Sequence, residues 1–174
     1  MPRLFFAIPV PVKVKKHLLS CFPQKNFPGI RFTPEENIHI TTHFLGATPD
    51  DRIPGIISSA ETISSSASPV EFKFDAIKLV FKDKKPVMIW IQFQENTTFE
   101  TLCLKYREAF PTDEKRKPLP HLTLARIKQL KKLPFDLPVV QPFSFIADRV
   151  ELLKSNLSAD GAQYEEITGW MFPR

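Results

Sequence analysis

Two histidine–threonine pairs occur in the sequence, each inside an apolar run. His39 and Thr41 form the first pair, and His121 and Thr123 form the second. Side chains two positions apart point to the same side of a β-strand, so each pair presents an imidazole and a hydroxyl together. The two histidines are 82 positions apart in a chain of 174 residues. This spacing predicts two similar halves that each contribute one pair to a shared cleft.

Two imidazoles and two hydroxyls around one centre suit phosphoryl transfer. A histidine with a pKa near 6.5 exchanges protons at neutral pH, and two of them can act as general acid and general base on opposite sides of a reacting group. One positioned acid or base accelerates a reaction roughly 10²- to 10⁴-fold, and one donor aimed at developing charge contributes about 2.7 to 4 kcal/mol. A single such histidine in a strand is usually structural, so the repetition carries the inference.

The residues around the two pairs indicate the strands that hold them, over residues 38–45 and 119–127. On the first strand, regular alternation places His43 on the face of His39 and Thr41, where it either borders the cleft or is a partly exposed surface residue. On the second strand, Arg126 follows His121 by five positions. Arg126 would therefore face away from the cleft, in a structural ion pair, unless a bulge or twist turns it inward.

The remaining chain predicts strands and helices that support these two strands. Residues 70–81 and 86–93 are expected to form a hairpin with its tip at 82–85, and Thr97–Glu100 has the spacing of a capping box at a helix start. Asp50 or Asp51 is expected to cap an earlier helix. Further strands are predicted over residues 4–8, 29–32, 143–153 and 163–170, helices over 12–22, 53–63 and 97–110, irregular chain over 128–140, and turns at 33–37 and 157–161.

Composition sets broad limits on the function. The formal net charge is +5 and the pI is about 9.2, which favours an anionic partner. Cys21 and Cys103 form no C-x-x-C pair, so a reducing compartment is the default. No apolar run reaches the length of a membrane span, and the first residues do not form a secretory signal. These features predict a soluble, cytoplasmic protein, with a monomer as the default.

Two stretches resemble the signature motifs of the 2H phosphoesterases, namely His39–Gly46 and Pro120–Arg126. The stretches Arg3–Ile8 and Gly29–Phe32 resemble the branch of RNA 2′,3′-cyclic phosphodiesterases, also called 2′-5′ RNA ligases. The resemblance spans nearly the whole chain. It implies a single domain over residues 1–174 with a bilobal α+β fold, in which two antiparallel-sheet lobes with flanking helices surround a central cleft. It also implies hydrolysis of RNA or nucleotide 2′,3′-cyclic phosphate ends to 2′-phosphomonoesters without metal or cofactor, with 2′-5′ ligation as the reverse reaction.

The same resemblance assigns roles to individual residues. His39 would protonate the departing 3′ oxygen and His121 would activate water, although the two roles could be exchanged. Thr41 and Thr123 would hold the non-bridging phosphate oxygens. The substrate-binding residues would also include Arg31, Phe32 and Arg126. Two positions depart from the family pattern: Thr42 stands where leucine is usual, and Phe32 stands where a larger aromatic is frequent.

Several alternatives remain open from the sequence. The chain could be a nucleotide- or RNA-binding module with the same cleft and no physiological turnover, or a 2′-5′ phosphodiesterase. A zinc site formed by His39, His43 and His121 is a further alternative, although no carboxylate or cysteine with recognisable spacing supports it. The basic segment Lys115–Lys117 either holds an RNA backbone or is a solvated loop.

Overall fold

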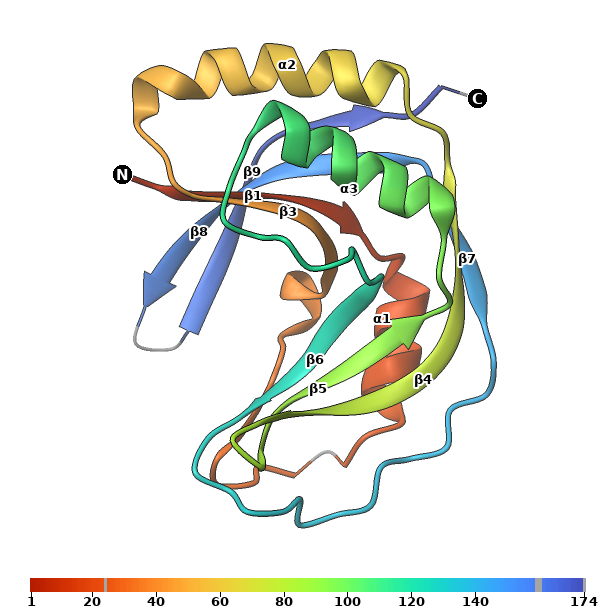
Figure 1. Cartoon of the computed structure of the whole chain (residues 1–174). Coiled ribbons are helices and arrows are strands. Elements are labelled where there is room, and N and C mark those ends of the chain that lie inside the picture. Colours follow the sequence, from red (N-terminus) through yellow and green to blue (C-terminus); the bar gives the residue numbers. More distant parts are fainter. Residues whose placement is uncertain (24, 159–160, 174) are drawn as a thin grey trace.

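Nine strands form one continuous antiparallel arrangement in the computed structural model, which describes residues 1–23, 25–158 and 161–173 (Figure 1). The strand order is β7-β4-β5-β6-β3-β1-β8-β9, and β2 pairs with β6. The strands are β1 (Arg3–Pro9), β2 (Ile30–Phe32), β3 (His39–Ala47), β4 (Val70–Lys82), β5 (Lys85–Phe93), β6 (His121–Ile127), β7 (Ser144–Ala147), β8 (Arg149–Ser158) and β9 (Gly161–Met171). The helices are α1 (Val12–Ser20), α2 (Ile53–Ser65) and α3 (Thr97–Ala109), with short 3₁₀ helices at Glu35–Asn37 and Asp50–Arg52. The predicted α+β class with antiparallel sheets is confirmed.

Two lobes meet where β3 and β6 touch. The first lobe contains β1, β3, β8 and β9 with helices α2 and α3, and the second contains β2, β4, β5, β6 and β7 with helix α1 (Figure 1). Only one position, Ile40 opposite Leu122, is paired between β3 and β6. By contrast, the pairing of β1 with β3 runs along the whole of β1. Because the junction is a single bridge, the two strands diverge on either side of it.

The lobes do not correspond to the two halves of the sequence, contrary to the predicted arrangement. Strands β8 and β9 come from the end of the chain but join the first lobe, where β8 pairs with β1. Helix α3 also follows the second-lobe strand β5 in sequence, yet it contacts β3 and α2. Strand β1 is buried along Leu4–Ile8 and lies between β3 and β8, as its continuous apolar run predicts.

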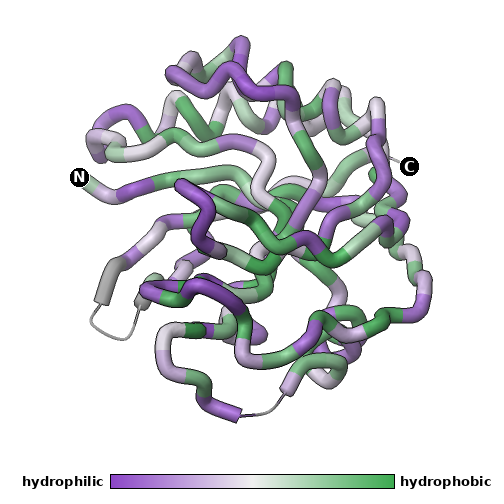
Figure 2. The backbone as a smooth tube through the Cα atoms, turned by 60° about the horizontal axis from the view of Figure 1, so that its bottom comes forward, coloured by the Kyte–Doolittle hydropathy of each residue, from purple (hydrophilic) through white to green (hydrophobic). Residues whose placement is uncertain are grey.

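Aromatic packing fixes α3 on the first lobe. Phe6 of β1 stacks on Tyr106 of α3 at a centroid distance of 4.2 Å, and Phe110 lies 5.5 Å from Phe6. The Tyr106 hydroxyl reaches the Ser64 hydroxyl of α2 at 3.0 Å, so the one polar atom of this buried ring is satisfied. Figure 2 shows mostly hydrophobic residues along the central strands and a mixture of hydrophobic and hydrophilic residues along the helices.

Two predicted helix caps are wrong. Helix α3 is capped by Asn96, whose side chain accepts a hydrogen bond from the Phe99 N–H at 3.0 Å, so the cap lies one residue before the predicted capping box. Asp50 and Asp51 lie within a 3₁₀ helix, and the residue at the N-cap of α2 is Arg52, without a side-chain cap. Pro54 in the first turn of α2 is instead compatible with a helix start, because its missing N–H would have no helical partner there.

The predicted strand over residues 143–153 is interrupted at Asp148. Strand β7 before this residue pairs with β4, and β8 after it pairs with β1, so the chain passes from one lobe to the other within a few residues. The following β8–β9 hairpin is formed as predicted. Two residues of its predicted turn, Ala159 and Asp160, lie outside the described residues. No described helix is both long and apolar enough for a membrane span.

Candidate active site

The two predicted His-x-Thr pairs lie on one face of the β3–β6 junction. The bridged residues Ile40 and Leu122 are fully buried and point into the core. Neighbouring positions of a strand point to opposite faces. The face away from the core therefore carries four partly exposed side chains: His39, Thr41, His121 and Thr123.

The antiparallel register determines how these four side chains lie relative to one another. One position on either side of the bridge, His39 comes opposite Thr123 and Thr41 comes opposite His121. Each histidine is therefore near the threonine of its own strand and that of the other strand. The arrangement has an approximate twofold symmetry about the bridge, with all four side chains on the face away from the core.

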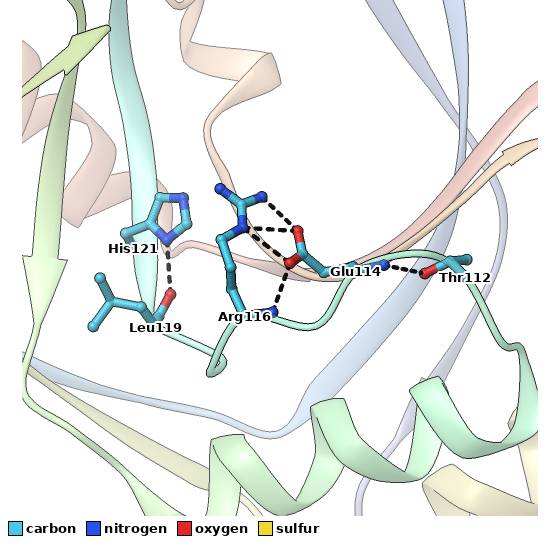
Figure 3. Close-up of polar contacts among 5 residues, drawn as sticks. All are labelled: Thr112, Glu114, Arg116, Leu119 and His121. Atoms are coloured by element: carbon cyan, nitrogen blue, oxygen red, sulfur yellow. Dashed lines mark hydrogen bonds and ion pairs between the residues drawn. The ribbon is translucent and has the colours of Figure 1, made fainter.

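A backbone carbonyl orients each imidazole. The Nδ1 atom of His39 lies 2.7 Å from the Asn37 carbonyl oxygen, and the Nδ1 atom of His121 lies 2.7 Å from the Leu119 carbonyl oxygen (Figure 3). A carbonyl can only accept, so Nδ1 carries the proton and the Nε2 atom of each neutral ring is unprotonated. In His39 this Nε2 atom accepts a hydrogen bond from the Thr41 hydroxyl at 3.1 Å. Both rings thus present Nε2 for proton transfer.

The surroundings favour the neutral form of both histidines. Burial lowers the pKa of His39 to about 4; the hydrogen bond to the Asn37 carbonyl opposes this shift, and the charges of Lys15 and Arg126 add to it. Burial also lowers the pKa of His121, its own carbonyl hydrogen bond raises it, and the Arg116 guanidinium lowers it. At pH 7 both Nε2 atoms can accept a proton. A proton donor in this site therefore needs a bound anion, which raises the pKa of a nearby histidine.

A β-bulge in β6 brings Arg126 to the face of the His121–Thr123 pair. The pairing with β5 skips Leu124, which is therefore an extra residue in its strand. Thr33 holds the bulge, because its N–H donates to the Leu124 carbonyl at 2.8 Å and its hydroxyl donates to the Thr123 carbonyl at 2.8 Å. Beyond the bulge the alternation is reversed, and Arg126 is exposed on the same side as His121. The alternative of a structural ion pair is not observed for Arg126 among the described residues.

A matching bulge in β3 corrects the predicted position of His43. The pairing of β1 with β3 skips Thr42, so His43 turns away from the face of His39. His43 is only 4% exposed, and its Nε2 lies 2.7 Å from the Phe110 carbonyl oxygen at the end of α3. His43 is therefore a buried structural residue. Phe44, five positions after His39 as Arg126 is after His121, takes the outward place and is 64% exposed.

The position of His43 removes the predicted alternative of a three-histidine zinc site. Its Nε2 atom is engaged with the Phe110 carbonyl on the side of β3 away from His39. Among the described residues, no group of three or more His, Cys, Asp or Glu side chains is arranged to hold a metal ion.

The bulge residue Thr42 provides a test of this geometry. Its side chain is 7% exposed, and its hydroxyl is a buried group without a hydrogen-bond partner among the described residues. We expect Thr42→Val, which keeps the shape and removes the unpaired hydroxyl, to raise the free energy of unfolding by about 1 kcal/mol without changing kcat. Thr48→Val is the matched control, because the equally buried Thr48 hydroxyl donates to the Gly46 carbonyl at 3.2 Å, and its loss should destabilise the protein. Urea unfolding of both variants checks this, and a destabilised Thr42→Val would contradict it.

A pocket of about 560 Å³ lies next to His39, because two of its lining residues, Phe5 and Tyr164, contact the His39 ring, whereas the four motif side chains are not part of its lining. Its lining combines four cationic side chains with three aromatic rings and contains no carboxylate among the described residues. The cationic residues are Arg3, Arg31, Arg126 and Lys128, and the aromatic residues are Phe5, Phe44 and Tyr164. Such a lining suits a ligand that has both phosphate groups and bases, because arginine binds phosphate and aromatic rings stack on bases.

Two of these cations lie directly beside each other. Arg31 of β2 is the cross-strand partner of Arg126 in β6, and both side chains are exposed. Like charges directly opposite each other destabilise a sheet. No described carboxylate forms an ion pair with either one. The arrangement therefore favours a bound anion that compensates for the repulsion.

Three aromatic residues at the histidines were not predicted as site residues. Trp90 of β5 stacks on His121 at 3.8 Å, Phe5 of β1 lies 5.0 Å from His39, and Tyr164 of β9 meets His39 edge-on at 5.2 Å. Trp90 could have been predicted from the sequence, because it alternates with the core residues of β5, the strand that pairs with the one carrying His121 and Thr123. Phe5 and Tyr164 had none, because β1 and β9 join this sheet only through long-range pairing.

Two predicted binding elements, Phe32 and the basic segment Lys115–Lys117, make different contacts from those predicted. Phe32 is not part of the pocket lining; it packs edge-on against Phe22 at 5.9 Å. In the basic segment, Arg116 pairs with Glu114 (Figure 3). Lys117 lies 2.9 Å from Glu95, so both side chains have defined partners.

Comparison with known proteins agrees with this fold. A family model described as LigT like phosphoesterase matches residues 8–90. The RNA 2′,3′-cyclic phosphodiesterase of Methanocaldococcus jannaschii is 29% identical over 183 residues, which cover 97% of this chain and 99% of that protein. A crystal structure of a Thermus thermophilus protein superposes with a TM-score of 0.82 at 21% identity, covering 98% of this chain and 97% of that one. Escherichia coli LigT complexed with 3′-AMP has a TM-score of 0.77 at 19% identity, and each chain is fully covered. The matched family model, the relatives and the fold agree, and the chain resembles the LigT-like phosphoesterases.

Proposed function

We propose that this protein hydrolyses the 2′,3′-cyclic phosphate at the end of RNA to a 2′-phosphomonoester. The observation that supports this most strongly is that two histidines with unprotonated Nε2 atoms and two threonine hydroxyls share one face of the β3–β6 junction. Relatives such as the Methanocaldococcus jannaschii protein bear the name RNA 2′,3′-cyclic phosphodiesterase, and cyclic phosphodiesterase activity follows from this relationship.

The reaction needs one proton acceptor and one proton donor. His121 Nε2 accepts a proton from water, whose oxygen forms a new bond to phosphorus. The bond from phosphorus to the 3′ oxygen breaks, and His39 Nε2 donates a proton to that oxygen. The hydroxyls of Thr41 and Thr123 donate to the two non-bridging oxygens, where negative charge increases. Because the site is nearly symmetric, the two histidines exchange the roles of acid and base when the substrate binds in the opposite orientation.

The substrate itself provides the charge that His39 needs to act as a donor. Burial holds the pKa of His39 near 4 in the empty site. The cyclic phosphate carries a negative charge, and an opposite charge within hydrogen-bond distance of Nε2 raises the pKa of an imidazole. Proton donation is therefore coupled to phosphate binding, and the empty site stays ready to accept a proton.

The adjoining pocket is the proposed place for the rest of an RNA substrate. A base of the terminal or preceding nucleotide stacks among Phe5, Phe44 and Tyr164, and a backbone phosphate lies between Arg31 and Arg126. These contacts favour oligonucleotides over mononucleotides. Action as a monomeric, cytoplasmic unit of residues 1–174 stays a prediction from the sequence.

The decisive test is turnover of a 2′,3′-cyclic nucleotide and of a short RNA with a 2′,3′-cyclic end, in the presence of a chelator, with 2′ and 3′ products resolved by chromatography. We expect the 2′ product from both, with the higher kcat/KM for the RNA. A protein that binds the nucleotide without turnover would be a binding module, and loss of activity in chelator would exclude the two-histidine mechanism. Hydrolysis should prevail over ligation because water is in large excess.

The pH dependence of the rate has an expected direction. The base must be neutral and the acid protonated, and kcat/KM reports both pKa values in the free enzyme. Because both histidine pKa values lie below 6.5, kcat/KM should have its maximum below pH 6.5 and fall about tenfold per pH unit above it. The kcat profile should lie at higher pH, because the bound phosphate raises the pKa of His39. Rates measured from pH 4 to 9 check this, and a kcat/KM maximum above pH 7 would contradict it.

A further inference from the structure

The loop between α3 and β6 is fixed at both ends by histidines of the two motif strands. At its start, His43 of β3 lies 2.7 Å from the Phe110 carbonyl oxygen, and at its end, His121 lies 2.7 Å from the Leu119 carbonyl oxygen. The Pro120 carbonyl also accepts a hydrogen bond from the Phe93 N–H at 3.0 Å. Both ends of the loop are therefore held beside the two motif strands.

Within this loop, Glu114 holds Arg116 by several bonds. The Arg116 Nε donates to both carboxylate oxygens at 2.9 and 3.1 Å, the Nη2 atom donates to the same carboxylate, and the Arg116 backbone N–H donates to Oε1 at 2.8 Å. These bonds and the charge of Arg116 lower the pKa of the Glu114 carboxyl to about 2, which keeps it ionised. When a carboxylate binds one edge of a planar guanidinium, the direction in which the opposite edge points is fixed as well.

The free edge of Arg116 faces the reacting side of His121. Figure 3 shows the guanidinium beside the imidazole, with the carboxylate of Glu114 on the far side and Nη1 without a dashed contact. The guanidinium charge lowers the pKa of His121, which agrees with this placement. The Arg116 side chain is 84% exposed, so it is accessible to a ligand in the cleft.

The neighbouring basic residues do not share this position. Lys117 bonds to Glu95 at 2.9 Å and lies 4.0 Å from Glu100, so its charge is directed toward β5 and α3. Lys115 has no hydrogen bond or ion pair within the described part of the chain. Arg116 also does not line the pocket that contains Arg126, so the two arginines approach the cleft from different sides.

We propose that Arg116 binds a non-bridging oxygen of the reacting phosphate through Nη1, and that Glu114 is the positioning residue that aims it. The proposal rests on the proposed function for the identity of the ligand, a phosphodiester that gains negative charge during reaction. Arg116 adds a fixed cation where the two threonines supply only neutral donors. Its charge also disfavours the imidazolium form and so adds to the effect of burial in keeping His121 neutral, as a proton acceptor must be.

The test compares Arg116→Met with Lys115→Met, which removes the same charge from the same loop without changing the Glu114–Arg116 pair. We expect Arg116→Met to lower kcat/KM about 10- to 100-fold, as for loss of a charged hydrogen bond, with most of the loss in kcat. Lys115→Met should lower kcat/KM less than about twofold.

Arg116→Lys should recover only part of the activity, because an ammonium cannot bind Glu114 and phosphate along two edges. Glu114→Gln should give a loss between those of the wild type and Arg116→Met. Equal losses in Arg116→Met and Lys115→Met, or an unchanged Glu114→Gln, would overturn the proposal.

A second readout does not depend on turnover. Titration of His121 followed by NMR should show a higher pKa in Arg116→Met than in the wild type and no change in Lys115→Met, and inorganic phosphate should bind more weakly to Arg116→Met alone. If the wild type lacks cyclic phosphodiesterase activity while these shifts are seen, the proposed function fails and the phosphate contact stands. If neither the His121 pKa nor phosphate binding changes, the role of Arg116 is excluded whatever the activity.

Discussion

Replacing His39 or His121 by alanine is expected to lower kcat about 10²- to 10⁴-fold for each residue. Each substitution removes one of the two Nε2 atoms that are oriented by the Asn37 and Leu119 carbonyls, and no other described histidine can take its place, because His43 is turned toward Phe110. The double variant should lose little more than the worse single variant, because a general acid and a general base that act in one step are not additive.

The experiment needs a control for simple loss of a histidine. His17 lies on the outer side of α1, is exposed, and contacts Phe143 edge-on at 6.0 Å, so His17→Ala should keep full activity. Circular dichroism should show that all the variants remain folded. His39→Asn and His121→Asn add a second comparison, because asparagine keeps a polar group of similar position but cannot exchange a proton. Activity of these asparagine variants near that of the wild type would exclude proton transfer by the histidines.

The second large effect is expected from the two threonine hydroxyls. Thr41→Val and Thr123→Val keep the side-chain shape and remove one donor each, and loss of one donor to developing charge costs about 10²- to 10³-fold in kcat. In the free protein the Thr41 hydroxyl donates to His39 Nε2 at 3.1 Å, so it already lies on the face of the histidines, and protonation of Nε2 leaves the hydroxyl able to donate to a phosphate oxygen. The effect should fall on kcat more than on KM, because charge on the non-bridging oxygens is greatest in the transition state.

Serine variants separate the hydroxyl from the methyl group. Thr41→Ser and Thr123→Ser retain the donor and should stay within about tenfold of the wild type, allowing for the greater rotational freedom of serine. Thr42→Val lies next to Thr41 on the opposite face and should not change kcat, which makes it the positional control. A valine variant that raises KM with kcat unchanged would show that the threonines bind the ground state and transition state equally.

The sequence by itself determined the chemical groups and the strands that carry them. His39, Thr41, His121 and Thr123 share a face because strand alternation is a local property of the backbone, and the apolar residues between them fix which face is buried. The antiparallel α+β class follows from similar local patterns. Arg31 was predicted as a binding residue from the family resemblance, and it lies in the lining of the pocket.

Only the tertiary structure decided which residues join these four. The bulges at Thr42 and Leu124 turn His43 into the core and Arg126 toward the cleft. A bulge is a mismatch between two strands, so it depends on the partner strand and leaves no local sequence signal. The return of β8 and β9 to the first lobe, which places Tyr164 beside His39, depends in the same way on pairing between residues more than a hundred positions apart. Local sequence specifies alternation and turn chemistry, whereas the free energy of long-range packing selects register and partner, and the outer residues of this site are fixed by the latter.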